Sequence, residues 1–131
     1  MTIYPLTFAT LLLALAVYFW SVAKVGRARG RYKVQAPAVT GAPEFERVLR
    51  AQQNTVEQLV AFVPLLLLAA IFWGDRWAAL YGMIWSVGRI LYIVTYAQDA
   101  QRRSLGFILS AGLSLLVLLA LAATLAIDVF A

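Results

Sequence analysis

Four long apolar stretches divide the chain, and short polar segments join them. Each stretch is long enough for an α-helix to cross a hydrocarbon layer of about 30 Å. Helices are expected at about residues 3–28, 44–72, 77–98 and 104–128. Short connections make successive helices antiparallel. The pattern therefore predicts an all-α fold, an integral membrane four-helix bundle that forms a single domain over residues 1–131.

The connecting segments have the composition of loops and turns. Residues 26–43 combine glycines, prolines and basic side chains, and residues 98–104 form a second short basic connection. Residues 74–76 (Gly-Asp-Arg) are expected to form a tight turn. Glu44 and Glu46 would lie in the first turn of the second helix, where the helix dipole favours negative charge.

Basic residues gather on one side of the predicted bundle. They are Lys24, Arg27, Arg29, Arg31 and Lys33 in one loop and Arg102 and Arg103 in another, against Arg76 alone at the opposite side. The positive-inside rule then predicts cytosolic basic loops and both termini outside, in the cytoplasmic membrane if the cell is prokaryotic. The first apolar run has its charges after it, so we expect a retained span and not a signal peptide.

Composition narrows the possible chemistry. The chain is 63% hydrophobic and 13% charged, against about 45–50% and about 25% in an average soluble domain. It has no cysteine and no histidine, which excludes a thiol nucleophile, an imidazole base and the usual zinc ligands of the protein itself. The formal net charge of +5 comes from basic clusters beside apolar spans, which favours membrane topology over nucleic-acid binding.

Two predicted helices carry polar stripes. Arg47, Arg50, Asn54 and Glu57 stand at offsets of 0, 3, 7 and 10, which places them within an arc of about 80° on one helix face. Gln52 points to nearly the opposite side. Because charged groups at membrane depth are costly unless they are paired or wetted, this stripe needs an explanation.

The third helix repeats this spacing with Arg89, Tyr92, Tyr96 and Asp99. Each residue alone has an ordinary explanation, since arginines pair with nearby carboxylates and tyrosines pack. Two facing stripes near the same end of the membrane instead indicate a binding site for a polar ligand.

Several segments together resemble the signature of the MAPEG family, membrane-associated proteins in eicosanoid and glutathione metabolism. They read PEFERV at 43–48, RAQxNxxE at 50–57, RxxYxxxYA at 89–97 and AQxR at 100–103. The likeness extends over most of the chain. Within the family, the sequence resembles the branch of leukotriene C4 synthase and the microsomal glutathione transferases.

The resemblance implies a homotrimer of four-helix subunits, with glutathione bound as cofactor at each subunit interface. It assigns to glutathione binding, from one subunit, Arg50, Asn54, Glu57 and Tyr92. It also assigns Arg29, Gln52, Tyr96 and Arg103, some of them from the neighbouring subunit. We add Arg89 as a binding candidate because it lies on the same helix stripe as Tyr92 and Tyr96. The branch also has a tyrosine at the position of Gln58 and an arginine at that of Gly30. These departures leave the second substrate open.

The resemblance also assigns thiol activation to Arg103, and Ser104, which follows it directly, is a candidate for a second donor. A thiol with a pKa of about 8.5 is only a few per cent thiolate at pH 7, and lowering that pKa by about two units requires about 2.7 kcal/mol. A charge-assisted hydrogen bond supplies about 1.5–3 kcal/mol. Without an imidazole, activation must be electrostatic. Arg50 and Arg29 suit the carboxylates of the tripeptide, and Glu57 suits its α-amine.

The resulting hypothesis is a membrane glutathione transferase whose thiolate attacks hydrophobic electrophiles that arrive from the lipid, and it extends to the reduction of hydroperoxides. One alternative is a non-enzymatic lipid-binding scaffold of the lipoxygenase-activating type. Another is a four-span multidrug exporter, which typically needs a carboxylate in its first span for proton coupling, and residues 3–23 contain none.

Overall fold

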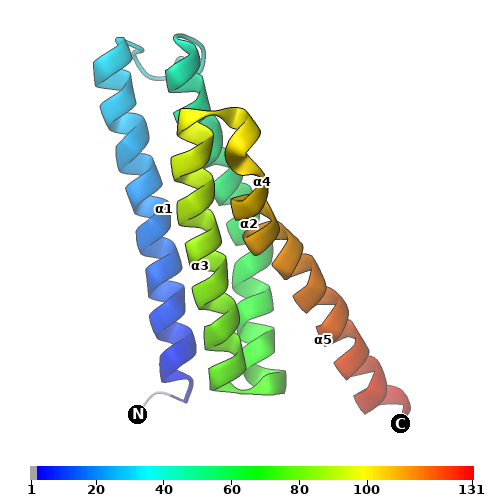
Figure 1. Ribbon diagram of the computed structural model, residues 1–131. Coiled ribbons are helices and arrows are strands. Elements are labelled where there is room, and N and C mark those ends of the chain that lie inside the picture. Colours follow the sequence, from blue (N-terminus) through cyan, green and yellow to red (C-terminus); the bar gives the residue numbers. More distant parts are fainter. Residues whose placement is uncertain (1–2) are drawn as a thin grey trace.

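A computed structural model describes residues 3–131 as a set of long helices. In chain order the elements are α1 (Pro5–Tyr32), α2 (Pro43–Trp73), α3 (Asp75–Gln98), η1 (Ala100–Arg103), α4 (Ser104–Phe107), η2 (Ile108–Gly112) and α5 (Leu113–Phe130). In Figure 1, α1, α2 and α3 run side by side, while α5 diverges from them toward the C-terminus. Within residues 3–131, four helical stretches are long and apolar enough to cross a membrane. The architecture is all-α and consistent with a membrane four-helix bundle.

The first helix is longer than the sequence pattern suggested. It was expected to end near residue 28, with a loop from residue 26, but α1 continues to Tyr32. The reason is tertiary packing, because Val25 and Ala28 join an apolar cluster with Phe45 at the start of α2. Lys33 then ends the helix in the left-handed conformation, with φ 55°.

The turn expected at residues 74–76 is shorter than predicted. Only Gly74, with φ +90°, separates α2 from α3, and Asp75 already begins α3. The Asp75 carboxylate accepts hydrogen bonds from Leu6 N (3.0 Å), Thr7 N (2.7 Å) and Thr7 Oγ1 (2.7 Å). The helix α1 has no side-chain cap of its own. Asp75 therefore satisfies the free N–H groups at the start of a different helix.

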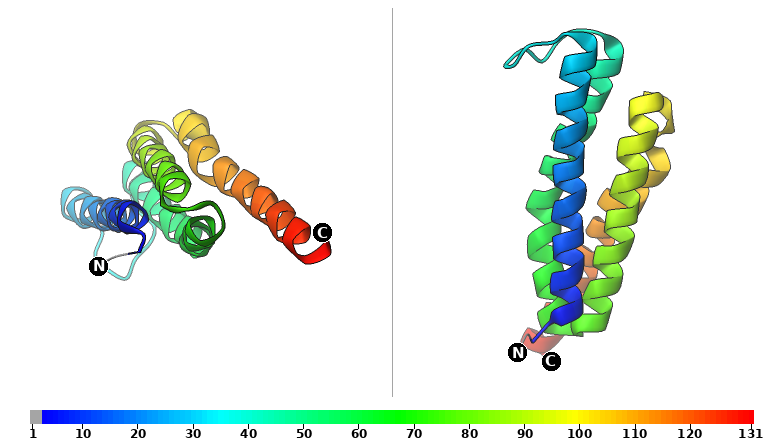
Figure 2. Two further views of the ribbon diagram at one scale, coloured as in Figure 1. Left: turned by 90° about the horizontal axis from the view of Figure 1, so that it is seen from below. Right: turned by 90° about the vertical axis from the view of Figure 1, so that its left-hand side faces the viewer.

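The centre of the bundle contains both aromatic and polar contacts between helices. The rings of Phe62 and Trp85 stack at 4.0 Å, which joins α2 to α3. The Tyr81 hydroxyl lies 2.6 Å from Ser114 Oγ and joins α3 to α5. Figure 2 shows α1, α2 and α3 grouped together while α5 leaves the group at one side.

The helices α3 and α4 meet through their backbones. A Cβ added at Gly106 would lie 2.7 Å from Gly88 O and also clash with the backbone nitrogen of Tyr92. Only glycine permits this approach, which is typical of small residues between membrane helices. The contact brings the Phe107 ring within 6.4 Å of the Tyr92 ring.

The side chain of Arg89 is fully buried between the helices. Its Nη2 donates to Thr55 Oγ1 on α2 (2.8 Å), and its Nη1 donates to Ser110 Oγ on η2 (3.3 Å). The guanidinium also stacks over the Tyr92 ring at 4.2 Å. Among residues 3–131 no carboxylate lies within 4.0 Å of it. Hydroxyl groups and an aromatic face therefore solvate the two Nη groups, while Nε has no hydrogen-bond partner among residues 3–131.

The same interaction coincides with an irregularity in the fourth helix. A continuous helix was expected at about residues 104–128, but residues Ile108–Gly112 form a π-helical turn. Ser110 lies inside this turn, and its Oγ donates to Gly106 O of α4 at 2.8 Å and accepts from Arg89. Side chains that bond to the preceding turn bend helices, and π turns often occur at functional sites.

We expect Gly106→Ala to lower the free energy of unfolding by about 1–3 kcal/mol, because its methyl group would press on backbone atoms that cannot move aside. Gly112→Ala is the matched control, since its Cβ would meet nothing closer than Ile108 at 3.7 Å. Thermal unfolding of both variants in detergent tests this. Equal behaviour of the two variants would contradict the close contact between α3 and α4.

Arg89→Met is expected to leave thermal stability in detergent unchanged or raised. Methionine fills similar space without the desolvation cost of a buried charge, and Thr55 and Ser110 keep their own backbone acceptors. Arg89→Ala should lower the free energy of unfolding by about 2–5 kcal/mol, because it leaves a void. If methionine destabilises the protein as much as alanine does, the charge itself holds the helices together.

Candidate functional site

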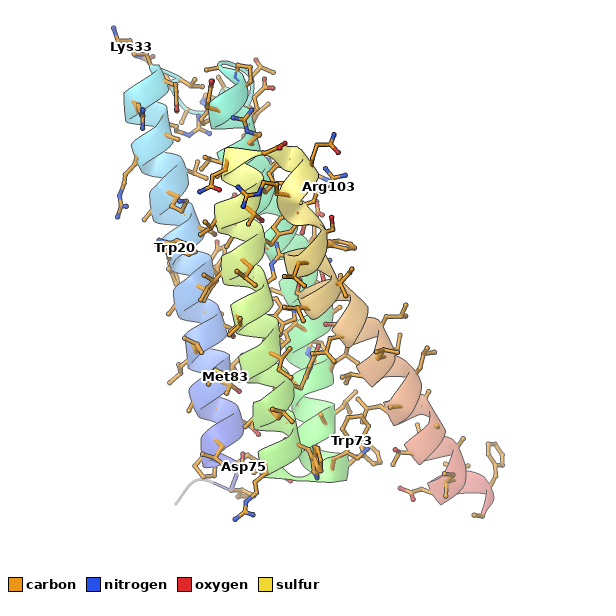
Figure 3. All side chains as sticks on the ribbon, in the orientation of Figure 1. Trp20, Lys33, Trp73, Asp75, Met83 and Arg103 are labelled. Atoms are coloured by element: carbon orange, nitrogen blue, oxygen red, sulfur yellow. The ribbon has the colours of Figure 1, made fainter. Side chains whose placement is uncertain are left out.

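A cavity of about 610 Å³ opens where α2, α3 and the segment after α3 meet. Its lining comprises Arg50 and Asn54 from α2, Tyr92 and Tyr96 from α3, and Ala100, Gln101, Arg103, Ser104, Phe107 and Ile108 from the following turns. Figure 3 shows Arg103 at the turn after α3, with Asp75 at the opposite end of the bundle. The cavity therefore lies toward the end of the bundle with the second basic connection.

The α2 wall of the cavity carries a polar triad. Arg50 Nη1 lies 3.4 Å from Glu57 Oε1, and Asn54 Nδ2 donates to Glu57 Oε2 at 3.3 Å. The spacing of three, four and seven residues puts these side chains on one helix face, as predicted. The Arg50 and Glu57 side chains are 53% and 55% exposed. Both remain accessible to a ligand.

Asn54 lines the cavity and contains a buried polar atom without a hydrogen-bond partner among residues 3–131. This atom is its Oδ1. Buried polar atoms are nearly always paired, so this oxygen calls for a donor. Because this oxygen has almost no accessible surface, the Asn54 side chain would have to turn before a ligand N–H in the cavity could reach it.

The α3 wall is aromatic. The rings of Tyr92 and Tyr96 stack with centroids 5.4 Å apart and an interplanar angle of 19°. Tyr92 is buried, with Arg89 against its inner side and Phe107 near its ring. The position of this wall is therefore set by the core of the bundle.

Arg103 reaches the cavity because the chain turns sharply after α3. Asp99 ends α3 in an extended conformation, and its carboxylate accepts from Gln101 N at 3.0 Å. This opens the short 3₁₀ turn η1, in which Arg103 Nη1 donates to Ala100 O at 3.2 Å. The Arg103 guanidinium lies 5.8 Å from the centre of the Tyr96 ring. Exposed Ser104 follows at the start of α4.

Four of the predicted site residues do not line this cavity. Arg89 lies inside the core. Arg29 on α1 donates to Ala38 O at 2.7 Å and stacks over Phe45 at 5.1 Å. Gln52 is half-buried on another face of α2. Glu57 is not part of the lining either, but it contacts Arg50 and Asn54, which are.

Arg47 belongs to the predicted stripe but has a different contact. Its Nε donates to Ala97 O at 3.2 Å, which ties α2 to the end of α3. It also lines a second hollow of about 600 Å³ that shares Arg50, Tyr96 and Ala100 with the cavity. The two hollows therefore adjoin, and Arg50 stands between them.

Phe107 and Ile108 were missed by the sequence reasoning. They reach the cavity through the π turn and the close approach of Gly106, neither of which is visible in a hydrophobic pattern. Gln101 was also not predicted, although it lies in the AQxR segment that carries the family resemblance and could have been named from it.

Comparisons with known proteins identify the family of the chain. The MAPEG family model matches residues 7–126. Microsomal glutathione S-transferase 2 of Homo sapiens is 48% identical over 97 residues, which cover 73% of this chain and 66% of that protein. Leukotriene C4 synthase of Bos taurus is 40% identical over 114 residues, which cover 87% and 75% of the two chains.

An uncharacterised protein of Synechocystis is 50% identical over 97 residues, which cover 74% of this chain and 71% of that protein. The matched part thus spans 66% to 75% of the length of these relatives. With a family model that matches nearly the whole chain, this protein belongs to the MAPEG family.

Proposed function

We propose that this protein is a membrane glutathione transferase that binds glutathione in the cavity between α2, α3 and η1 and presents its sulfur, as a thiolate, to hydrophobic electrophiles. The observation that carries the proposal is the convergence of Arg50, Asn54 and Arg103 on one cavity whose other wall is formed by Tyr92 and Tyr96. The relatives named for glutathione transfer and leukotriene C4 synthesis support the choice of thiol.

Several groups of the tripeptide have a matching side chain. Arg50 offers a guanidinium for a carboxylate, and Glu57 offers a carboxylate for the α-amine. The Asn54 side chain turns toward the ligand, and its Oδ1 then accepts from a ligand N–H. Tyr92 and Tyr96 form the wall against which the peptide lies. Arg89 is not a proposed ligand contact, because its guanidinium is enclosed by Thr55, Ser110 and Tyr92.

Arg103 is the proposed activator of the sulfur. A guanidinium cannot act as a base, so it acts by stabilising the negative charge, and the thiol proton leaves to water. Ser104 adds a neutral donor at the same edge of the cavity. A thiolate formed here is also a nucleophile toward a hydroperoxide, so we include peroxide reduction in the proposed activity.

Assembly completes the proposed site. We propose a homotrimer in which Arg29 and Gln52 serve the cavity of a neighbouring subunit, since both lie outside the cavity of their own chain. We also place both basic loops in the cytosol and both termini outside. The whole chain acts as one membrane domain in this arrangement.

Arg103→Gln should abolish most of the thiolate absorbance that appears when glutathione is mixed with the protein. Loss of one charge-assisted hydrogen bond returns the sulfur to about a few per cent thiolate at pH 7. Conjugation of a chlorinated aromatic electrophile should fall in parallel. Arg102→Gln is the matched control, because Arg102 has the same charge but bonds to Gln98 outside the cavity.

Two results would contradict this assignment. Equal thiol ionisation in the protein and in Arg103→Gln would remove Arg103 from the mechanism. If the unmodified protein neither ionises glutathione nor conjugates the electrophile but binds lipid, it is the non-enzymatic scaffold.

Mixed oligomers test whether Arg29 acts across subunits. Co-expression of Arg29→Gln and Arg103→Gln chains should restore activity, because some cavities then combine an intact Arg103 with a neighbour's intact Arg29. Co-expression of Arg50→Gln and Arg103→Gln chains is the control and should restore none, since both residues line the cavity of one chain. Failure of the first pair to complement would place Arg29 outside the site or in its own subunit.

A further inference from the structure

A separate cavity of about 340 Å³ lies on the opposite side of α3 from the proposed active site, where α1 faces α3. Three cationic side chains of α1 line it, namely Lys24, Arg27 and Arg31, together with Val48 of α2 and Val94 of α3. It shares no lining residue with the active-site cavity. The region where α1 faces α3 is called the α1–α3 seam below.

The three cations of the seam have no acceptor. Among residues 3–131, none of them makes a hydrogen bond or an ion pair, and the only carboxylate in the lining is Glu44. Lys24 and Arg31 instead lie over the rings of Trp20 (5.2 Å) and Tyr32 (5.5 Å). By contrast, the arginines that line or adjoin the active-site cavity each donate to a defined acceptor; they are Arg47, Arg50, Arg89 and Arg103. The seam therefore holds an excess of positive charge.

An apolar groove lies along the same seam. It measures about 290 Å³ and is lined by Ala16, Val17, Trp20 and Ile90. Trp20 precedes Lys24 by one helical turn, or about 6 Å toward the middle of the span. Because the Lys24 ammonium lies over the Trp20 ring, the cationic cavity and the groove are linked. Figure 3 shows Trp20 on α1 between Lys33 at one end and the middle of the bundle.

We propose that the α1–α3 seam is a binding site for an anionic phospholipid, with the phosphate among Lys24, Arg27 and Arg31 and an acyl chain along the groove beside Trp20. Basic residues at the cytosolic membrane surface attract anionic lipid, and tryptophan favours the depth of the headgroup region. The choice of an anionic lipid follows from charge, because three cations face one carboxylate. A zwitterionic lipid also carries a positively charged ammonium group, which the three cations would repel.

Tryptophan quenching by brominated lipid tests the proposal on the full-length protein. The protein is reconstituted in phosphatidylcholine vesicles that contain increasing amounts of brominated phosphatidylglycerol or, separately, brominated phosphatidylcholine. The difference between the protein and Trp20→Phe isolates the signal of Trp20. We expect half-maximal quenching of Trp20 at a mole fraction of brominated phosphatidylglycerol at least about fivefold lower than that of brominated phosphatidylcholine.

Arg27→Gln should raise that mole fraction about fivefold, the effect of one cation near an anionic surface. Lys33→Gln removes the same charge at the same end of α1, but Lys33 lies outside the cavity. This variant should leave the mole fraction at half-maximal quenching unchanged. Equal effects of the two variants, or equal quenching by the two lipids, would overturn the proposal in favour of diffuse attraction. Displacement of the lipid by soluble glycerol phosphate would also overturn it, since the acyl chain would then contribute nothing.

Discussion

The burial of one guanidinium group governs how the interior of this bundle is arranged. Arg89 is fully buried, and among the described residues it has hydroxyl and aromatic partners but no carboxylate. A cation at membrane depth is costly unless its surroundings solvate it. Thr55 and Ser110 must therefore turn toward it, and Tyr92 must offer its ring. These contacts join α2, α3 and η2 around one side chain, and they coincide with the π turn in the fourth helix.

The proposed active site follows from that arrangement. The Tyr92 ring has the Arg89 guanidinium on its inner side, while on its outer side it lines the cavity with Tyr96 and Phe107. The glycine contact between α3 and α4 brings Phe107 to this wall. A rigid, desolvated core thus supports a polar cavity at its edge, and the flexible charged side chains of Arg50 and Arg103 lie at the rim.

Helical spacing was sufficient to predict much of this cavity. It placed Arg50 with Asn54 and Tyr92 with Tyr96, because residues three and four apart share a helix face whatever the tertiary fold. Helical spacing could not predict that Arg89 points into the core while Tyr92 and Tyr96 line the cavity. All three lie on one arc of α3, and one edge of that arc faces the core while the other faces the cavity. The π turn, the Asp75 cap and the extension of α1 depend on contacts between distant segments, namely Ser110 with Arg89, Thr7 with Asp75, and Phe45 with Val25. A single sequence does not display such contacts.

Energetics indicate why the polar triad of α2 points to a ligand. An exposed ion pair such as Arg50–Glu57, at 3.4 Å, contributes only about 0–1 kcal/mol to stability. The buried Asn54 oxygen without a partner costs about 1–3 kcal/mol. The triad therefore does little to stabilise the isolated chain and leaves an acceptor unsatisfied. A bound molecule that carries charges opposite to Arg50 and Glu57, and a donor toward which the Asn54 side chain could turn, would reverse both effects, and a zwitterionic peptide has these groups.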